Sequence, residues 1–186
     1  MGMPLRHRYT AEMVRRLNER EPQWWPRYEV VDGDLLVTPA PRKWHYELAD
    51  RIDEALRTYL RHEGVGRVYH SPSDISWGAK KLVQPDVFVL PLDEARKYEW
   101  KDVRRLMLVV EILSPSTAHN DRYIKRRLYQ LHGVPLYWIV APDACTVECW
   151  TPSDLEPRIE RTGIVWHPEG ASAPFEMSLA ELFQPL

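Results

Sequence analysis

The stretch Leu106-Met107-Leu108-Val109-Val110-Glu111-Ile112-Leu113 decides the fold of this chain. All of its residues except Glu111 are apolar, and so short and continuous an apolar run is typical of a strand covered on both faces. A carboxylate inside such a strand is costly unless it is paired, protonated or bound to a metal. The sequence therefore leaves two interpretations of Glu111 open, a structural pair with an Arg or Lys and a functional site.

The residues after this strand predict a parallel neighbour for it. The pattern from about Asn120 to His132 is helical, and Gly133 ends it. A second buried strand is predicted from Pro135 to Val140. Strand, helix and strand in this order predict a right-handed crossover between parallel strands, and hence a mixed or parallel sheet.

Two local patterns before this strand are equally clear. Asp32-Gly33 lies between two β-rich runs and is a preferred pair for a tight hairpin turn. From Trp44 to about His62, apolar residues recur every four positions, which predicts an amphipathic helix. A second apolar run, Leu82 to Leu90, carries a single acid, Asp86, directly after Pro85. A structural aspartate in a turn is the other interpretation of Asp86.

Composition predicts one α/β domain. The chain has 186 residues, of which 44% are hydrophobic, enough for a substantial core. We expect residues 1–42 to form an N-terminal helix and β-hairpin packed on a core of residues 43–186. The formal net charge of -2 neither indicates nor excludes nucleic-acid binding. No signal peptide or membrane-spanning apolar run is visible, so we expect a cytoplasmic protein with no membrane partner.

Four residues form a candidate site. Asp86 and Glu111 belong to two predicted strands, and two such carboxylates can hold Mg²⁺ together with the backbone carbonyl of Ile112. A bound ion polarises a phosphoryl oxygen and activates water, and the ammonium of Lys125 can assist that water. Glu47, at the edge of the apolar stripe of the first long helix, can complete the metal shell. Ordinary i, i+4 pairing explains Glu47 and Lys125 equally well, with Arg51 and Asp121 as their partners.

The sequence also resembles the PD-(D/E)XK, or restriction-endonuclease-like, nucleases, and more closely the Uma-type endonuclease family among them. The resemblance spans roughly Tyr9 to Phe183. It rests on the following segments: Arg27-Tyr28-Glu29-Val30-Val31-Asp32-Gly33, Pro39-Ala40-Pro41 with His45, Pro85-Asp86-Val87, Val110-Glu111-Ile112-Leu113-Ser114-Pro115-Ser116-Thr117, Asp121-Arg122 with Lys125, and Gly133-Val134-Pro135 with Tyr137-Trp138.

The resemblance implies a restriction-endonuclease-like α/β sandwich whose mixed central sheet is flanked by helices. It also implies a metal-dependent endonuclease acting on DNA, with Mg²⁺ or Mn²⁺ on Asp86, Glu111 and Ile112. One departure concerns the lysine of the wider superfamily, because Leu113 stands where that lysine is expected. In the Uma-type group the lysine is thought to come from the following helix, which here implies Lys125. His45 is left out of the catalytic set because a lone histidine is more often structural.

Partners follow less directly from the sequence. Candidates for contacts to nucleic-acid phosphates are Lys80, Lys81, Arg126 and Arg127. We expect a homodimer, from the aromatic content and the open sheet edges, and no organic cofactor. The rival hypothesis is an inactive nuclease fold that serves as a binding module, which the weak net charge favours. Sequence alone does not separate DNA from RNA as the substrate, and it does not reveal a cleavage sequence.

Overall fold

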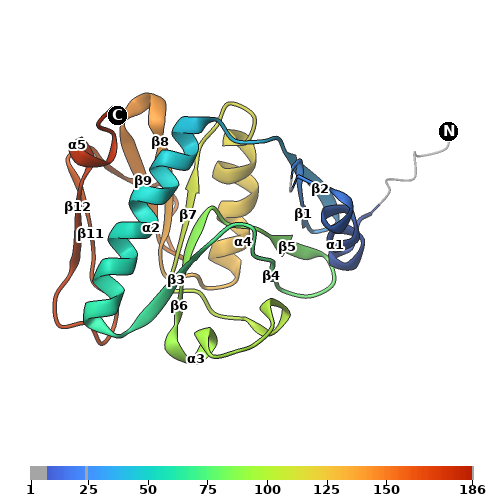
Figure 1. Cartoon of the computed structure of the whole chain (residues 1–186), viewed down its shortest axis with the longest axis horizontal. Coiled ribbons are helices and arrows are strands. Elements are labelled where there is room, and N and C mark those ends of the chain that lie inside the picture. The colour runs from blue at the N-terminus through green and yellow to red at the C-terminus, as the bar shows by residue number, and fades with distance from the viewer. Residues whose placement is uncertain (1–7, 24, 186) are drawn as a thin grey trace.

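The computed structural model describes residues 8–23 and 25–185, and a six-stranded mixed sheet lies at its centre (Figure 1). The strand order is β10-β9-β8-β7-β6-β3. The strands are β3 (Gly66–His70), β6 (Val87–Pro91), β7 (Leu108–Ile112), β8 (Tyr137–Ala141), β9 (Thr146–Trp150) and β10 (Arg158–Glu160). β7 and β8 are parallel, and the other neighbouring pairs are antiparallel. The predicted parallel pair joined through a helix is confirmed.

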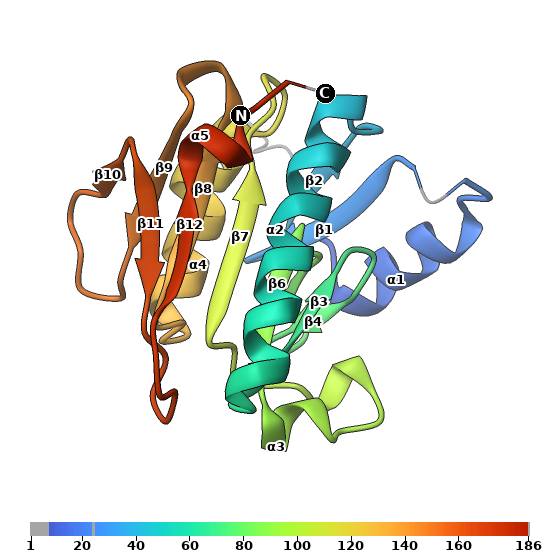
Figure 2. The same ribbon diagram turned by 60° about the vertical axis from the view of Figure 1, so that its left-hand side comes forward.

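Both faces of this sheet are covered, as the apolar run predicted. Because side chains alternate between the faces of a strand, Leu108 and Val110 pack on one side and Val109 on the other. On the first side lies α2 (Lys43–Glu63), which buries Leu48, Ile52, Leu56 and Leu60. On the second side lies α4 (Arg126–Leu131) with Leu128 and Tyr129 (Figure 2). The predicted α/β fold with helices flanking a mixed sheet is confirmed.

The N-terminal segment joins the core through a second sheet. β1 (Arg27–Val31) and β2 (Asp34–Thr38) form the predicted hairpin, and Asp32 and Gly33 both have positive φ, as a tight turn of this kind requires. β1 also pairs with β5 (Lys81–Val83), giving the order β2-β1-β5-β4 with β4 (Ile75–Ser76). α1 (Ala11–Arg20) packs Ala11 and Val14 on this sheet.

The apolar run from Leu82 to Leu90 is divided between the two sheets. β5 ends at Val83, and β6 begins at Val87 in the six-stranded sheet. Pro85 lies between them, where its missing N–H group interrupts a regular ladder. This break carries Asp86 to the junction of the two sheets.

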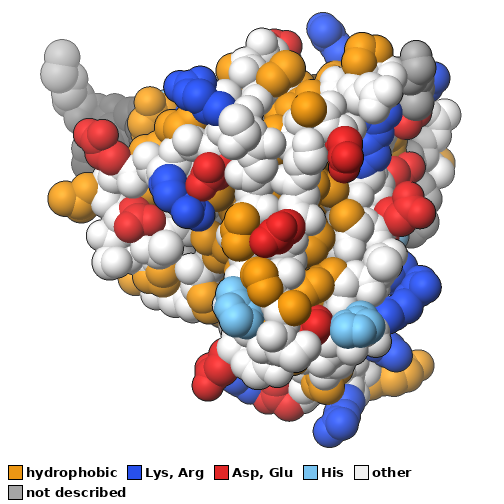
Figure 3. Space-filling model, turned by 90° about the vertical axis from the view of Figure 1, so that its left-hand side faces the viewer, with side chains coloured by type: hydrophobic (Ala, Val, Ile, Leu, Met, Phe, Trp, Pro, Cys, Tyr) orange, Lys and Arg blue, Asp and Glu red, His pale blue; other side chains and the backbone are white. Residues whose placement is uncertain are grey.

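The C-terminal segment covers the α2 side of the sheet. β11 (Gly163–Trp166) and β12 (Phe175–Ser178) form a separate hairpin, followed by α5 (Leu179–Leu182). Hydrophobic, acidic and basic side chains alternate over this side of the molecule without a broad patch of one sign (Figure 3). The sequence pattern did not predict a strand at β12. The remaining short elements are α3 (Leu92–Ala95), η1 (Trp100–Asp102) and η3 (Pro142–Ala144). Within the described ranges, no helix has the length and apolarity needed to cross a membrane.

Candidate active site

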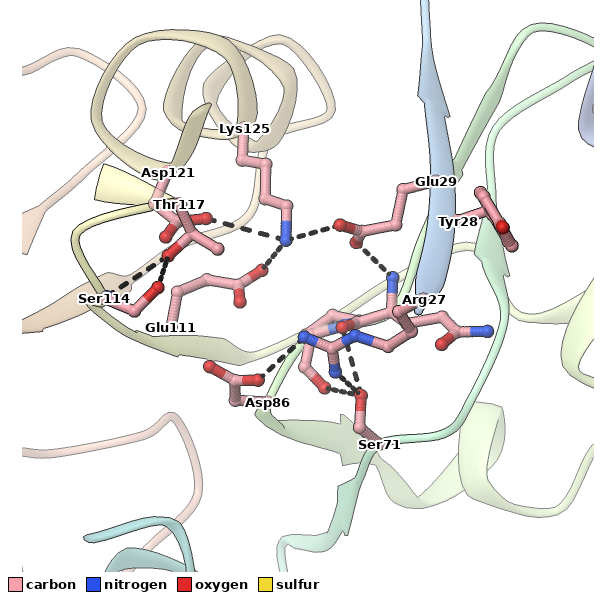
Figure 4. Close-up of polar contacts among 12 residues, drawn as sticks. Arg27, Tyr28, Glu29, Ser71, Asp86, Glu111, Ser114, Thr117, Asp121 and Lys125 are labelled. Carbon is pink, nitrogen blue, oxygen red and sulfur yellow. Dashed lines mark hydrogen bonds and ion pairs between the residues drawn. The ribbon is translucent and has the colours of Figure 1, made fainter. Parts of the chain in front are cut away.

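Glu111 faces α4 because of its position in β7. It has the same strand parity as Val109, so its side chain lies on the side of the sheet that α4 covers. Its Oε1 atom accepts hydrogen bonds from Lys125 Nζ at 2.9 Å and from the Tyr129 hydroxyl at 3.0 Å. The other oxygen points toward Asp86 (Figure 4) and accepts no hydrogen bond from the described residues. Both sequence interpretations are therefore compatible with the contacts: Glu111 has a buried lysine partner and one oxygen left over.

Asp86 lies at the end of the β6–β7 pairing. The register pairs Val87 with Val110, so the next hydrogen-bonded pair in the ladder would join Pro85 to Ile112. Pro85 has no N–H group to donate, so the regular backbone pair is incomplete. The Asp86 side chain bonds to the partner strand at this point, because its Oδ2 accepts the Ile112 N–H at 2.9 Å. The N–H and C=O of one residue in a strand point to the same side, so the Ile112 carbonyl faces this junction as well.

Two basic side chains hold the Asp86 carboxylate. Arg27 Nη2 donates to Asp86 Oδ1 at 3.1 Å, and His45 Nε2 lies 3.1 Å from Asp86 Oδ2. Arg27 comes from β1 and also contacts Ser71, while His45 comes from the first turn of α2. Trp25 lies over the Arg27 guanidinium, with its ring centroid 5.0 Å from Cζ. Residues from both sheets and from α2 therefore contribute to the site.

Lys125 lies at the centre of three carboxylates. Its Nζ atom is 2.9 Å from Glu111, 3.0 Å from Glu29 and 3.6 Å from Asp121, and the lysine side chain is only 4% exposed (Figure 4). The predicted helix begins with a π-helical turn, η2 (Asn120–Lys125), which buries Asp121 and Lys125 together. Such wide turns are frequent at functional sites, because they change the direction in which side chains project.

Burial and charge set the protonation of these groups. Burial opposes ionisation of Lys125, but Glu111, Glu29 and Asp121 raise its pKa above the ordinary value, so the amine is an ammonium ion at neutral pH. Burial would raise the pKa of Asp86, yet His45, Arg27 and the Ile112 N–H together lower it well below its usual range. Burial raises the pKa of Glu111 well above its usual value, in spite of Lys125. Asp86 is therefore the permanently ionised acid of the pair.

Asp121 gives a testable pH dependence. Burial raises the pKa of its carboxyl from 3.8 to about 6, although Lys125 opposes the shift. The folded state then binds this proton more tightly than the unfolded state, so stability falls as the pH rises from about 4 to above 6. In Asp121→Asn that contribution is absent, and the stability of the variant relative to the parent should rise by up to roughly 3 kcal/mol between pH 4 and 8. Urea unfolding at the two pH values measures the difference. The exposed Asp102→Asn is the control, and equal pH dependence in parent and Asp121→Asn would contradict the prediction.

A single cavity brings most of the candidate residues together. Its volume is about 230 Å³, and it is lined by Asp86, Glu111, Ile112 and Lys125, with Arg27 and His45 beside them. We call it the Asp86–Glu111 cavity. Its wall also includes the hydroxyl-bearing residues Ser114, Ser116 and Thr117 of the loop after β7.

The donor atoms of this cavity suit a hard divalent cation. Two carboxylates, one of which has a free oxygen, and a backbone carbonyl are the ligand types that Mg²⁺ takes, with water and phosphate oxygens filling the remaining positions. Within residues 8–23 and 25–185, no three His, Cys, Asp or Glu side chains gather as a metal cluster. The candidate protein ligands are thus two carboxylates and one backbone carbonyl.

The structure does not bring every predicted residue to the cavity. Glu47 is not among the residues of its wall, because it lies two positions after His45 on α2, roughly 200° around the helix. His45 occupies the place that the sequence analysis assigned to Glu47. None of the four predicted phosphate-binding residues lines the cavity either. Lys81 pairs with Asp32, and Arg126 lies over the Trp150 ring.

Three residues next to the predicted acids were not part of the predicted site. Glu29 is fully buried, pairs with Lys125 and accepts the Gln84 N–H at 2.7 Å. Arg27 and His45 both hold Asp86. The sequence signal for Arg27 and Glu29 was that charged residues occupy alternate positions of the hairpin strand Arg27–Val31. A strand face exposed to solvent explains this pattern equally well.

Comparisons with known proteins concern the family and the fold of the chain. A family model described as "Uma2: Putative restriction endonuclease" matches residues 12–183. The crystal structure of a putative nuclease belonging to DUF820 from Anabaena variabilis has a similar fold, with a TM-score of 0.71. It is 22% identical to this chain, and the match covers 85% of this chain and 90% of that one. At this identity the likeness concerns the fold alone. The chain has no match among curated proteins.

Proposed function

Because the chain belongs to the Uma2 restriction-endonuclease family, and membership of that family supports nuclease activity, we propose that it hydrolyses phosphodiester bonds in DNA with the help of Mg²⁺ or Mn²⁺. The observation that carries this proposal is the convergence of Asp86, Glu111, the Ile112 carbonyl and Lys125 on one cavity. The cytoplasmic location and the homodimer stay predictions from the sequence.

Asp86, Glu111 and the Ile112 carbonyl are the residues that would hold the ion. When bound, the ion polarises a phosphoryl oxygen and makes a coordinated water more acidic. Asp86 is ionised at all relevant pH values and kept in place by Arg27 and the Ile112 N–H, so its orientation is set before substrate arrives. Glu111 has an elevated pKa and must give up its proton before it can act as a ligand.

Lys125 contributes charge in this mechanism. Its raised pKa keeps Nζ protonated, so it is a poor general base and a good hydrogen-bond donor. From its position beside Glu111 it can orient the attacking water and offset the negative charge that develops on the phosphoryl oxygens. Glu29 and Asp121 restrain the ammonium from the other sides.

Nicking of supercoiled plasmid tests the proposal. We expect the parent protein to nick DNA in Mg²⁺ or Mn²⁺ and not in EDTA. Glu111→Gln removes one carboxylate without changing its size, and should slow nicking by about 100-fold or more. Glu156→Gln, at an exposed acid that is not part of the cavity wall, is the matched control and should leave the rate unchanged. Equal nicking by parent and Glu111→Gln would overturn the proposal.

One observation favours the second candidate, a nuclease fold that binds without cleaving. Both carboxylates already have basic partners, and the described residues include no cluster of three metal-binding side chains. Calorimetric titration with Mn²⁺ separates the two functions. A metal-dependent nuclease binds Mn²⁺ through Asp86 and Glu111, whereas an absence of binding at millimolar metal favours the binding module.

A further inference from the structure

Three adjoining cavities, which together we call the groove, begin at the Asp86–Glu111 cavity and follow α2. A second cavity, of about 460 Å³, shares Trp25, Arg27, His45 and Asp86 with it. A third, of about 700 Å³, shares His70, Ser71 and Pro72 with the second. The three cavities are lined by α2 residues from His45 to Arg61, a path of roughly 24 Å at the helical rise, and β3 residues line the third of them.

The middle cavity has the composition of a site for a flat aromatic ligand. Trp25 and Tyr46 contribute rings, and Tyr46 is 48% exposed although it lies on the helix that covers the core. Pro41, Ala49 and Pro72 add apolar wall. The Asp50 carboxylate is exposed at the same cavity and can accept hydrogen bonds from an amino group. An exposed tyrosine and a half-buried tryptophan with a nearby acceptor suit a nucleobase, because every base offers a π face for stacking.

The far end of the groove is basic. Arg57, Arg61 and Arg67 line the third cavity beside His70. Arg57 donates three hydrogen bonds to the Asp53 carboxylate, from Nε and Nη2. Arg61 and Arg67 are exposed, and neither forms an ion pair with a described residue. Two free guanidinium groups at the end of an otherwise mixed surface are well suited to backbone phosphates.

We propose that this groove binds one unpaired strand of the DNA substrate. The scissile phosphate lies in the Asp86–Glu111 cavity, an adjacent base stacks in the cavity of Trp25 and Tyr46, and later phosphates of the same strand contact Arg61 and Arg67. This inference rests on the proposed function, since it names the form of DNA that the same site takes. Paired bases are stacked inside a duplex and do not reach a side cavity unless they are unpaired first.

Binding without cleavage tests the groove directly. The probe is a fluorescein-labelled single-stranded DNA of about 12 nucleotides, titrated in EDTA and followed by fluorescence anisotropy. We expect Tyr46→Ala to weaken binding by about tenfold, the effect of losing one base–aromatic stack. The double variant Arg61→Ser/Arg67→Ser should reduce the slope of log K against log salt by about 1.4, two phosphate contacts on a single strand.

Matched controls exclude general effects of charge and fold. Arg158→Ser/Arg161→Ser removes the same charge near β10, at the opposite edge of the six-stranded sheet from β3, and Tyr98→Ala removes a tyrosine that is 97% exposed. Both should bind the probe like the parent. Parental affinity in the groove variants, or tighter binding of the same sequence as a duplex, overturns the inference.

The outcomes separate this inference from the proposed function. If the parent nicks plasmid but the groove variants bind the oligonucleotide as tightly as the parent does, the nuclease proposal is supported and the groove inference is wrong. If oligonucleotide binding depends on the groove residues but no metal supports nicking, the groove inference is supported and the nuclease proposal is wrong.

Discussion

Lys125→Met is expected to produce the largest combined loss of activity and stability. The substitution removes the ammonium group that contacts Glu29, Glu111 and Asp121, all of which are nearly inaccessible to solvent. Breaking a buried pair by removing one partner costs about 3–5 kcal/mol, because the remaining charge stays buried without compensation. In a chain of this size that corresponds to a lower Tm by roughly 6–20 °C. Plasmid nicking should fall by about 100-fold or more, since the donor beside the phosphate is gone.

Two variants make this result specific. Lys125→Arg keeps the charge and should recover part of the lost stability, but its planar group does not reproduce the single Nζ contact, so nicking should stay low. Lys101→Met, at an exposed lysine of η1, controls for the loss of a positive charge. Thermal unfolding followed by circular dichroism gives the Tm values, and nicking is measured at a temperature where each variant is folded. A Tm for Lys125→Met within 2 °C of the parent, roughly the effect of 1 kcal/mol, would contradict the buried-cluster interpretation.

Asp86→Asn is the second change with a large expected effect. Asparagine still offers an acceptor to the Ile112 N–H, but it removes the negative charge that faces Arg27 and His45. We expect a loss of about 3 kcal/mol in stability and the loss of Mn²⁺ binding in calorimetry. Nicking should decrease by about 100-fold or more.

The pH dependence of this loss has a definite sign. The folded pKa of Asp86 is depressed, so its stabilisation is fully present above the ordinary value of 3.8 and is lost as the pH falls through the lower folded value. The part of the difference in unfolding free energy between parent and Asp86→Asn that comes from ionisation of Asp86 should therefore be fully present above about pH 4 and shrink only in strong acid.

A double variant separates the charge pair from general damage. If Arg27 and Asp86 stabilise each other, Arg27→Met/Asp86→Asn should lose less stability than the sum of the two single variants. Asp93→Asn breaks an exposed ion pair with Arg105 and serves as the control, with an expected cost of no more than about 1 kcal/mol. Additive losses in the cycle would mean that the Arg27–Asp86 contact contributes little.

Much of the fold was predictable because its signals are local. The turn at Asp32-Gly33 needs only two residues that accept positive φ, and α2 needs only an apolar residue at every fourth position. The buried strand β7 was evident from its unbroken apolar run. The two acids were visible as well, since a carboxylate in an apolar run has few explanations.

The position of Glu47 shows where local reasoning ends. Its place at the edge of the apolar stripe allowed it to turn inward, but the rotation of α2 against the sheet brings His45 to Asp86 instead. Residues two positions apart on a helix project from nearly opposite faces. The packing of the helix on the sheet decides which of the two residues faces the site.

The sequence by itself determined the α/β class, the main elements and the presence of charged groups that a core does not tolerate alone. Only the tertiary structure decided how those charges pair: Glu29 from β1 meets Lys125 from η2, and Arg27 meets Asp86 across the break at Pro85. The physical reason is the range of the interactions. Turns and helices depend on residues a few positions apart, whereas a buried ion pair depends on which distant strands the whole core brings together.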